Sequence, residues 1–166
     1  MQTRNTTTTG ITGTAARGAI DILVQDHVQI KHLLQTLTTA KGADERRTTL
    51  EQLKELLTIH NATEENFVYP AIEKVAGKKL DAEHLYHETA QADVVVFELD
   101  TCLNTGDTSG FAANAQKLRD AVLEHIGDEE QKAFPTLREK ADPEQTKMLD
   151  NAVRKFRSSL RFAPTT

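Results

Sequence analysis

One motif occurs twice in this chain, on a residue spacing that restricts how the chain can fold. The motif has the form His-x3-Glu-Glu-x4-Pro. Its two copies are His60-x3-Glu64-Glu65-x4-Pro70 and His125-x3-Glu129-Glu130-x4-Pro135. In the stretches leading into both copies, apolar residues recur at intervals of three and four, which places them on one face of a helix. This internal repeat predicts a fold built from two similar helical hairpins.

The same spacing extends along most of the chain. Helices are expected at about 19–39, 44–75, 80–104, 110–140 and 142–160. Asp44 is expected to cap the second helix, Pro70 to kink or shorten it, and Pro143 to begin the fifth. Four amphipathic helices with short connections favour an all-α, antiparallel up-and-down four-helix bundle. The fifth helix contains no His and is expected to pack on the outside of the bundle.

The composition indicates one main domain. The chain has 166 residues, of which 38% are hydrophobic, and this length allows a substantial core. Residues 1–18 are rich in Thr and lack periodicity, so a disordered arm is expected there. We expect the bundle at 19–140 and an additional C-terminal helix with a short tail at 141–166.

Charge and cysteine content exclude several classes of protein. The net charge of −5 disfavours nucleic-acid binding, which needs a basic face. The single cysteine, Cys102, cannot form an internal disulfide and is expected in the core. No apolar run approaches the roughly 20 residues that a membrane span needs, and the start does not resemble a signal peptide. The expected location is therefore the cytoplasm.

The polar residues on the apolar stripes carry the chemical prediction. Seven His and Glu side chains occupy positions expected to be buried: His27, His60, Glu64, His84, Glu88, His125 and Glu129. An unpaired carboxylate in a helical core costs several kcal/mol, which a bound metal ion would offset. Imidazole and carboxylate without thiolate suit iron, manganese or zinc, and seven ligands suit two ions better than one.

Each of these residues also has an ordinary structural explanation. His27 or His84 alone could be a buried histidine bonded to a carboxylate, but the duplicated His/Glu pairs make them candidate ligands as well. His87 competes with His84 for the third-helix position. Glu65 and Glu130 are expected to face solvent or to bond the ligands from outside. Tyr69 and Phe134, which are equivalent in the repeat, are expected to close the bundle near the site.

At this point the chain resembles hemerythrin-like proteins, the HHE cation-binding domains, over about 19–140. The two motif copies and the preceding Asp26-His27 carry the resemblance. It implies two iron ions joined by an oxo or hydroxo bridge and by two carboxylates, Glu64 and Glu129. It further implies that His27 and His60 bind one iron, which keeps an open position. His125 and two third-helix residues would bind the other iron.

The third helix departs from the oxygen-carrying pattern, which has two His four residues apart where this chain has His84 and Glu88. The resemblance implies a protein that binds or senses O2, NO or peroxide, its expected small-molecule partners. Because an extra carboxylate favours ferric iron, a ferroxidase or catalase-like, peroxide-consuming enzyme of oxidative-stress defence is the alternative. A metal-binding bundle that acts through protein partners is a further alternative.

Overall fold

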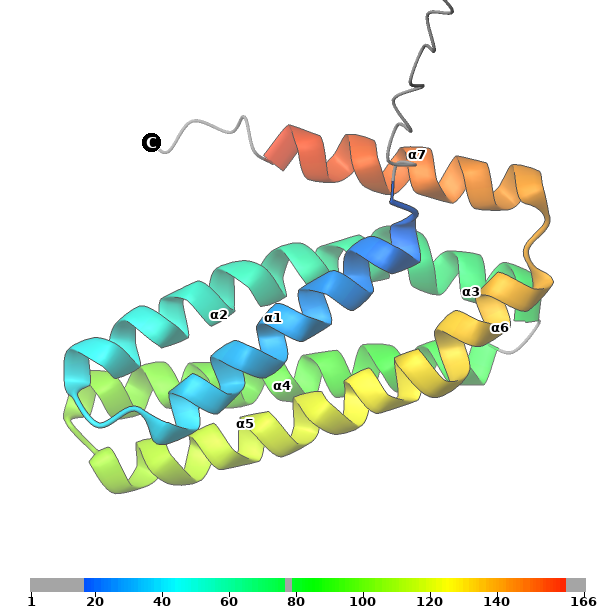
Figure 1. Ribbon diagram of the computed structural model, residues 1–166. Helices are drawn as coiled ribbons and strands as arrows, with labels where there is room; N and C mark the ends of the chain where they lie inside the picture. Colours follow the sequence, from blue (N-terminus) through cyan, green and yellow to red (C-terminus); the bar gives the residue numbers. More distant parts are fainter. Residues whose placement is uncertain (1–16, 77–78, 161–166) are drawn as a thin grey trace, which may run out of the picture.

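The computed structural model describes residues 17–76 and 79–160, and these fold as helices with short connections (Figure 1). The elements are α1 (Ala19–Thr39), α2 (Ala43–Thr63), η1 (Glu64–Val68), α3 (Tyr69–Ala76), α4 (Lys79–Thr105), α5 (Thr108–Asp128), η2 (Glu129–Ala133), α6 (Phe134–Lys140) and α7 (Pro143–Leu160). The predicted all-α bundle with an additional C-terminal helix is confirmed. The arm predicted at 1–18 and the tail after 160 lie largely outside the described residues.

Four long arms form the bundle. We call each long helical unit of the bundle an arm. Two arms are the single helices α1 and α4. The other two are the continuous units α2–η1–α3 and α5–η2–α6. α1 packs on α2 and α5, and α4 packs on α5, so neighbouring arms lie side by side (Figure 1). α7 lies along the outside against α1, α2 and η1, as expected for the helix without histidine.

Local residue chemistry sets the helix ends. Gly106 has a positive φ of 73°, the left-handed conformation that glycine adopts freely, and it ends α4. Asp107 then caps α5 by accepting a 2.9 Å hydrogen bond from the Gly110 N–H. Asp142 caps α7 in the same way, with Pro143 as the first helical residue. Asp44 was expected to cap α2, but Gly42 occupies that position and Asp44 lies in the first turn.

Both motif copies contain a π-helical segment, η1 and η2. The Tyr69 N–H donates to the Glu64 carbonyl, and the Phe134 N–H donates to the Glu129 carbonyl, each across five residues. The expected kink at Pro70 is thus a widened turn before the proline, and the arm continues beyond it. Such a turn is compatible with a proline, which has no N–H for the usual helical bond. It also brings Tyr69 over the face that carries Glu64.

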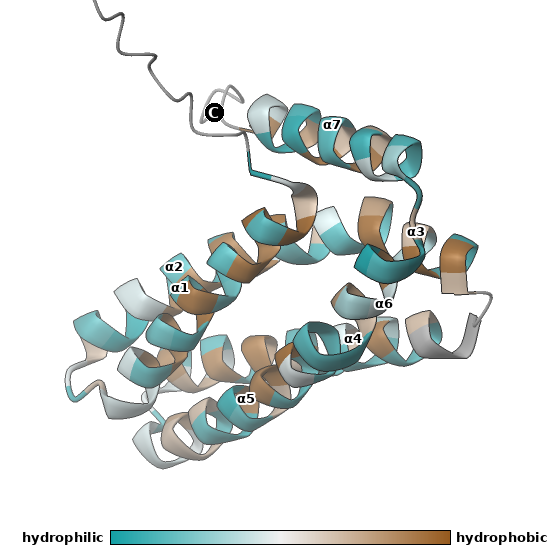
Figure 2. Cartoon of the chain, turned by 45° about the vertical axis from the view of Figure 1, so that its right-hand side comes forward, coloured by the Kyte–Doolittle hydropathy of each residue, from teal (hydrophilic) through white to brown (hydrophobic). Residues whose placement is uncertain are grey.

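The core consists of two apolar clusters. One lies toward the loops after α1 and α4 and includes Ile30, Leu57 and Leu99, while the other includes Leu23, Val68 and Leu85. In Figure 2 the hydrophobic residues of α1, α4 and α5 face one another, whereas α7 is largely hydrophilic. The motif residues lie between the two clusters. Among the described helices, none is both long enough and apolar enough to cross a membrane.

Candidate metal centre

Four buried side chains from three arms meet in the middle of the bundle. They are His27 from α1, His60 from α2, Glu64 from η1 and Glu129 from η2, and one ligand atom of each lies within 4.8 Å of the others. His27 Nε2 is 3.2 Å from Glu129 Oε2 and 3.9 Å from Glu64 Oε1, and His60 Nε2 is 3.1 Å from Glu64 Oε1. All four are at most 2% exposed, so water does not solvate them.

Three of these buried atoms have no hydrogen-bond partner: His27 Nε2, Glu64 Oε1 and Glu129 Oε2. They lie close together without forming hydrogen bonds with one another. Buried polar atoms are nearly always satisfied, so three unsatisfied atoms in one place need an explanation. Ligands of one first-row metal ion at about 2.1 Å lie roughly 3 Å apart, similar to these separations. The residues therefore fit a metal ion.

The outer nitrogens of the imidazoles support the same interpretation. Each buried imidazole has its Nδ1 beside a carboxylate outside the centre, namely His27 with Glu130 at 2.8 Å, His60 with Asp26 at 3.4 Å and His125 with Glu88 at 2.9 Å. A carboxylate on Nδ1 fixes the ring so that Nε2 is free to bind, and metal-ligating histidines usually have such a partner. This geometry assigns the predicted outer carboxylate Glu130 to His27. The part played by Asp26 was not predicted, although it directly precedes His27.

A second group of donor atoms lies on the other side of the two glutamates. The Tyr69 hydroxyl donates to Glu129 Oε1 at 2.9 Å, and its oxygen also lies 3.3 Å from both Glu64 Oε2 and His125 Nε2. His125 Nε2 is 3.5 Å from Glu129 Oε1. Each glutamate thus offers one oxygen to each group. The sequence indicated that Tyr69 lies near the site, but not that its hydroxyl contacts both carboxylates.

α4 does not present its histidines to this centre. The prediction that His84 is buried is wrong, because Leu85, Thr89 and Ala92 face the core and the side chain of His84 is 56% exposed.

His84 and Glu88 do lie together, at 2.9 Å, but their third neighbour is Asp128, at 3.6 Å from His84, at the surface. Glu88 reaches the centre only through His125. The competing residue His87 is exposed and bonds the Gln91 amide at 2.8 Å.

The family model of the hemerythrin HHE cation-binding domain matches residues 18–137, about seven tenths of the chain. The chain belongs to this family. As a hemerythrin HHE domain it is a metal-binding helical protein, and the buried His/Glu group is where it could hold a metal. The family match ends before α7.

One curated relative of this hemerythrin HHE domain is a protein named DNA nickase from Nostoc sp. (strain PCC 7120 / SAG 25.82 / UTEX 2576). The two are 22% identical over 141 residues, which cover 85% of this chain and 39% of that protein. The chain thus spans about two fifths of the length of that relative.

Burial and charge set the protonation of the metal-free centre. Burial, reinforced by the negative charge of Glu129, raises the pKa of Glu64 well above its usual range. Burial also acts to raise the pKa of Glu129, but its contact with His27 and the nearby imidazoles of His125 and His60 together lower it. Burial lowers the pKa of His60, and burial beside two carboxylates raises that of Tyr69. In the domain without metal, Glu64 therefore keeps its proton to higher pH than Glu129 does, and His60 loses its proton at lower pH than a free histidine does.

These directions predict that metal affinity rises with pH. A metal ion needs the Glu64 carboxylate, so binding must release the proton that the raised pKa retains. His60 is already neutral at neutral pH because its pKa is lowered, so it adds no competing proton. Affinity for Co²⁺ should therefore increase by up to about tenfold per pH unit at pH values below the raised pKa of Glu64. Calorimetry in two buffers of different ionisation enthalpy measures the proton release, and a pH-independent affinity would contradict the assignment.

Proposed function

We propose that this chain is a non-haem di-iron protein that binds dioxygen, nitric oxide or peroxide beside its metal pair. The observation that carries the proposal is the set of three unsatisfied buried atoms on His27, Glu64 and Glu129. Two imidazoles and two carboxylates suit iron, which supplies a redox couple and an open coordination position for a small molecule. The net charge of −5 supports a small-molecule partner rather than DNA.

The first iron position would be held by His27, His60, Glu64 and Glu129. Its imidazoles have their outer nitrogens on Glu130 and Asp26, so the rings are oriented before metal arrives.

The second position would be held by His125, Tyr69 and the remaining oxygens of Glu64 and Glu129. The hydroxyl of Tyr69 lies 2.9–3.3 Å from all three partners, which supports a position that these four residues share. His84 and Glu88, expected from the family resemblance as the third-helix ligands, are not part of this proposed set.

A small cavity beside the centre supports the class of ligand. Its walls include Ile30, Leu57, Ala92 and Val122, and His60 and His125 also line it. The volume that the centre of a water-sized sphere can occupy in this cavity is about 10 Å³, which is close to what one water molecule needs. Space for about one water-sized molecule supports a very small ligand over a larger organic substrate.

Iron content and nitric oxide binding test the proposal. The chain is loaded with ferrous iron under anaerobic conditions, freed of excess metal and analysed for iron, with two ions per chain expected. Nitric oxide is then titrated and followed by absorption. Less than one retained iron per chain would contradict the iron assignment. It would favour a bundle that acts through protein partners.

Filling the cavity should separate ligand binding from metal binding. Ala92→Leu places three extra carbon atoms in the cavity, so we expect unchanged iron content but nitric oxide affinity weakened roughly tenfold, or about 1.4 kcal/mol. Ala90→Leu, at an exposed position of the same helix, is the matched control and should bind as the unchanged chain does. Full nitric oxide affinity in Ala92→Leu would place the ligand elsewhere.

A second candidate function is iron oxidation or peroxide consumption. The observation in its favour is that α4 brings no imidazole to the centre, and the phenol of Tyr69 lies beside His125 instead. Oxygen donors favour ferric iron, which works against reversible oxygen carriage. Mixing the ferrous protein with oxygen distinguishes the two. A reversible coloured complex supports binding, whereas prompt irreversible oxidation or steady loss of added peroxide supports the enzyme.

A further inference from the structure

A chain of contacts runs from α7 to the buried centre, although the family match at residues 18–137 does not include α7. Arg157 of α7 donates two hydrogen bonds to Asp26, from Nη1 to Oδ2 at 2.6 Å and from Nη2 to Oδ1 at 3.0 Å. Asp26 Oδ2 is also the atom that lies 3.4 Å from His60 Nδ1. Arg157 and Asp26 thus connect the outer helix to His60, a candidate metal ligand.

The side chains of Asp26 and Arg157 are both largely buried. The side chain of Asp26 is 8% exposed and that of Arg157 is 18% exposed, so their interaction is only weakly screened by solvent. A paired guanidinium and carboxylate with two parallel bonds has a defined geometry, unlike a single exposed ion pair. Without Arg157, the Asp26 carboxylate would be buried beside His60 with no cationic partner and free to rotate. The orientation of the His60 ring would then be less well defined.

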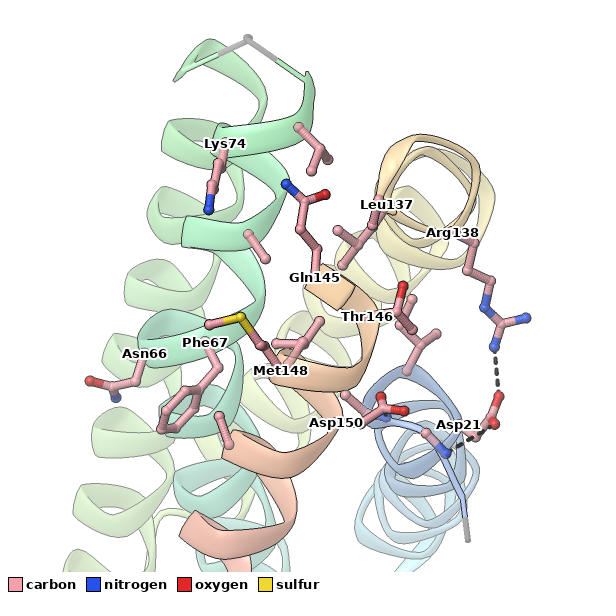
Figure 3. Close-up of a pocket in the computed structure, with 18 residues that line it drawn as sticks. Asp21, Asn66, Phe67, Lys74, Leu137, Arg138, Gln145, Thr146, Met148 and Asp150 are labelled. Atoms are coloured by element: carbon pink, nitrogen blue, oxygen red, sulfur yellow. Dashed lines mark hydrogen bonds and ion pairs between the residues drawn. The ribbon is translucent and has the colours of Figure 1, made fainter. Parts of the chain in front are cut away.

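α7 depends on this kind of contact because it buries little apolar surface. Val153 is its one fully buried residue among those described. A cavity of about 600 Å³ separates the first half of α7 from the bundle, with Met148 of α7 and Phe67 of η1 among its lining residues (Figure 3). Arg157 lies in the second half of α7, beyond this cavity. Arg157 thus adds a contact in the second half of α7 to those that Leu149 and Asp150 make in the first half.

We propose that Arg157 is a positioning residue for the metal centre, holding Asp26 so that Asp26 orients His60 for metal binding. The inference rests on the proposed metal centre, since His60 is one of its ligands. This role of Arg157 makes α7 part of the site, in addition to covering the outside of the bundle. Disturbing α7 at Arg157 therefore changes metal binding without changing any ligand.

The affinity of the whole chain for Co²⁺ tests this role, with Co²⁺ alone as the probe. Competition against a chromophoric chelator gives the dissociation constant, and the visible spectrum of bound Co²⁺ reports its coordination. We expect Arg157→Ala to weaken Co²⁺ binding by about 10- to 100-fold, the range found when the outer partner of a metal ligand is lost. Arg157→Lys should recover only part of the affinity, since an ammonium does not make the two parallel bonds.

Arg154→Ala is the matched control, because Arg154 lies on the same helix and bonds the Arg17 carbonyl instead of Asp26. It should bind Co²⁺ as the unchanged chain does. Asp26→Ala should weaken binding, and adding Arg157→Ala to it should cause no further loss, because both changes break one link. If Arg157→Ala does not fold, as judged by circular dichroism, Arg157→Gln takes its place in each comparison.

The outcomes separate this inference from the proposed function. If the unchanged chain binds no Co²⁺, the metal centre is wrong and the role of Arg157 with it. If the unchanged chain binds and His60→Ala does not, but Arg157→Ala binds normally, the centre stands and the role of Arg157 is overturned. Equal losses in Arg154→Ala and Arg157→Ala would also overturn it, because the effect would then come from detaching α7.

Discussion

Replacing Glu129 by glutamine is expected to abolish metal binding while the metal-free chain stays folded. Like Glu64, Glu129 presents one oxygen to each group of donors: Oε2 lies 3.2 Å from His27 Nε2, and Oε1 lies 3.5 Å from His125 Nε2. Its loss therefore removes a ligand from both proposed positions. Since loss of an outer partner alone weakens metal binding by about 10- to 100-fold, loss of this ligand should exceed about a hundredfold.

The metal-free fold should tolerate Glu129→Gln. Glutamine has nearly the same shape, and its carbonyl oxygen can still accept the hydrogen bond that Tyr69 donates at 2.9 Å. The cost should stay near the roughly 1–3 kcal/mol of one altered buried polar group, below the stability of an ordinary domain. Equilibrium dialysis with Co²⁺ measures the first effect and circular dichroism the second.

Glu124→Gln is the control for this change. Glu124 is exposed on α5, and its replacement by glutamine removes the same negative charge. It should retain full metal content. If Glu129→Gln binds two metal ions per chain with unchanged affinity, the carboxylate does not serve both positions. The centre would then need a different set of ligands.

The sequence predicts best those helices in which only one set of residues can form the buried apolar stripe. In α1, α2 and α5 the buried stripes lead directly into His27, His60 and His125, and all three are buried. The bundle and its outer helix follow from the same periodicity and from short loops. In these arms, polar residues on an apolar stripe were sufficient to locate the centre.

α4 could not be predicted in the same way, because two neighbouring stripes have almost the same spacing. One passes through His84 and the other through Leu85 and Thr89, and both continue to Val95 and Leu99. Preferring the stripe with His placed a surface residue in the core. Neighbouring arms decide this choice, since Leu85 packs in one cluster with Tyr69 and Phe134, and Glu88 lies 2.9 Å from His125 of α5.

The π-helical segments were also not predictable from the apolar spacing. A widened turn shifts the phase of every later residue, and the sequence indicated only an irregularity near each proline. That shift places the hydroxyl of Tyr69 between Glu64 and Glu129. The contact from Arg157 to Asp26 joins residues 131 positions apart in the chain, so no local pattern indicates it.

Metal binding is expected to stabilise the chain strongly. Without metal, burial and the neighbouring Glu129 raise the pKa of Glu64, and three buried polar atoms of the centre lack partners. A bound cation satisfies these atoms and offsets the cost of burying the two carboxylates. Because only the folded chain assembles this site, free metal at a thousand times its dissociation constant should add about 4.1 kcal/mol to the free energy of unfolding.

For a chain of 166 residues, this free energy corresponds to a melting temperature raised by roughly 8–16 °C. Thermal unfolding of the metal-free chain, followed by circular dichroism with and without excess Co²⁺, measures the shift. Mg²⁺ prefers oxygen ligands and its own water, so at the same concentration it should change the melting temperature little. Glu129→Gln should lose the response to Co²⁺. An equal shift with both cations would indicate general screening of acidic surface charge rather than a site built from imidazoles.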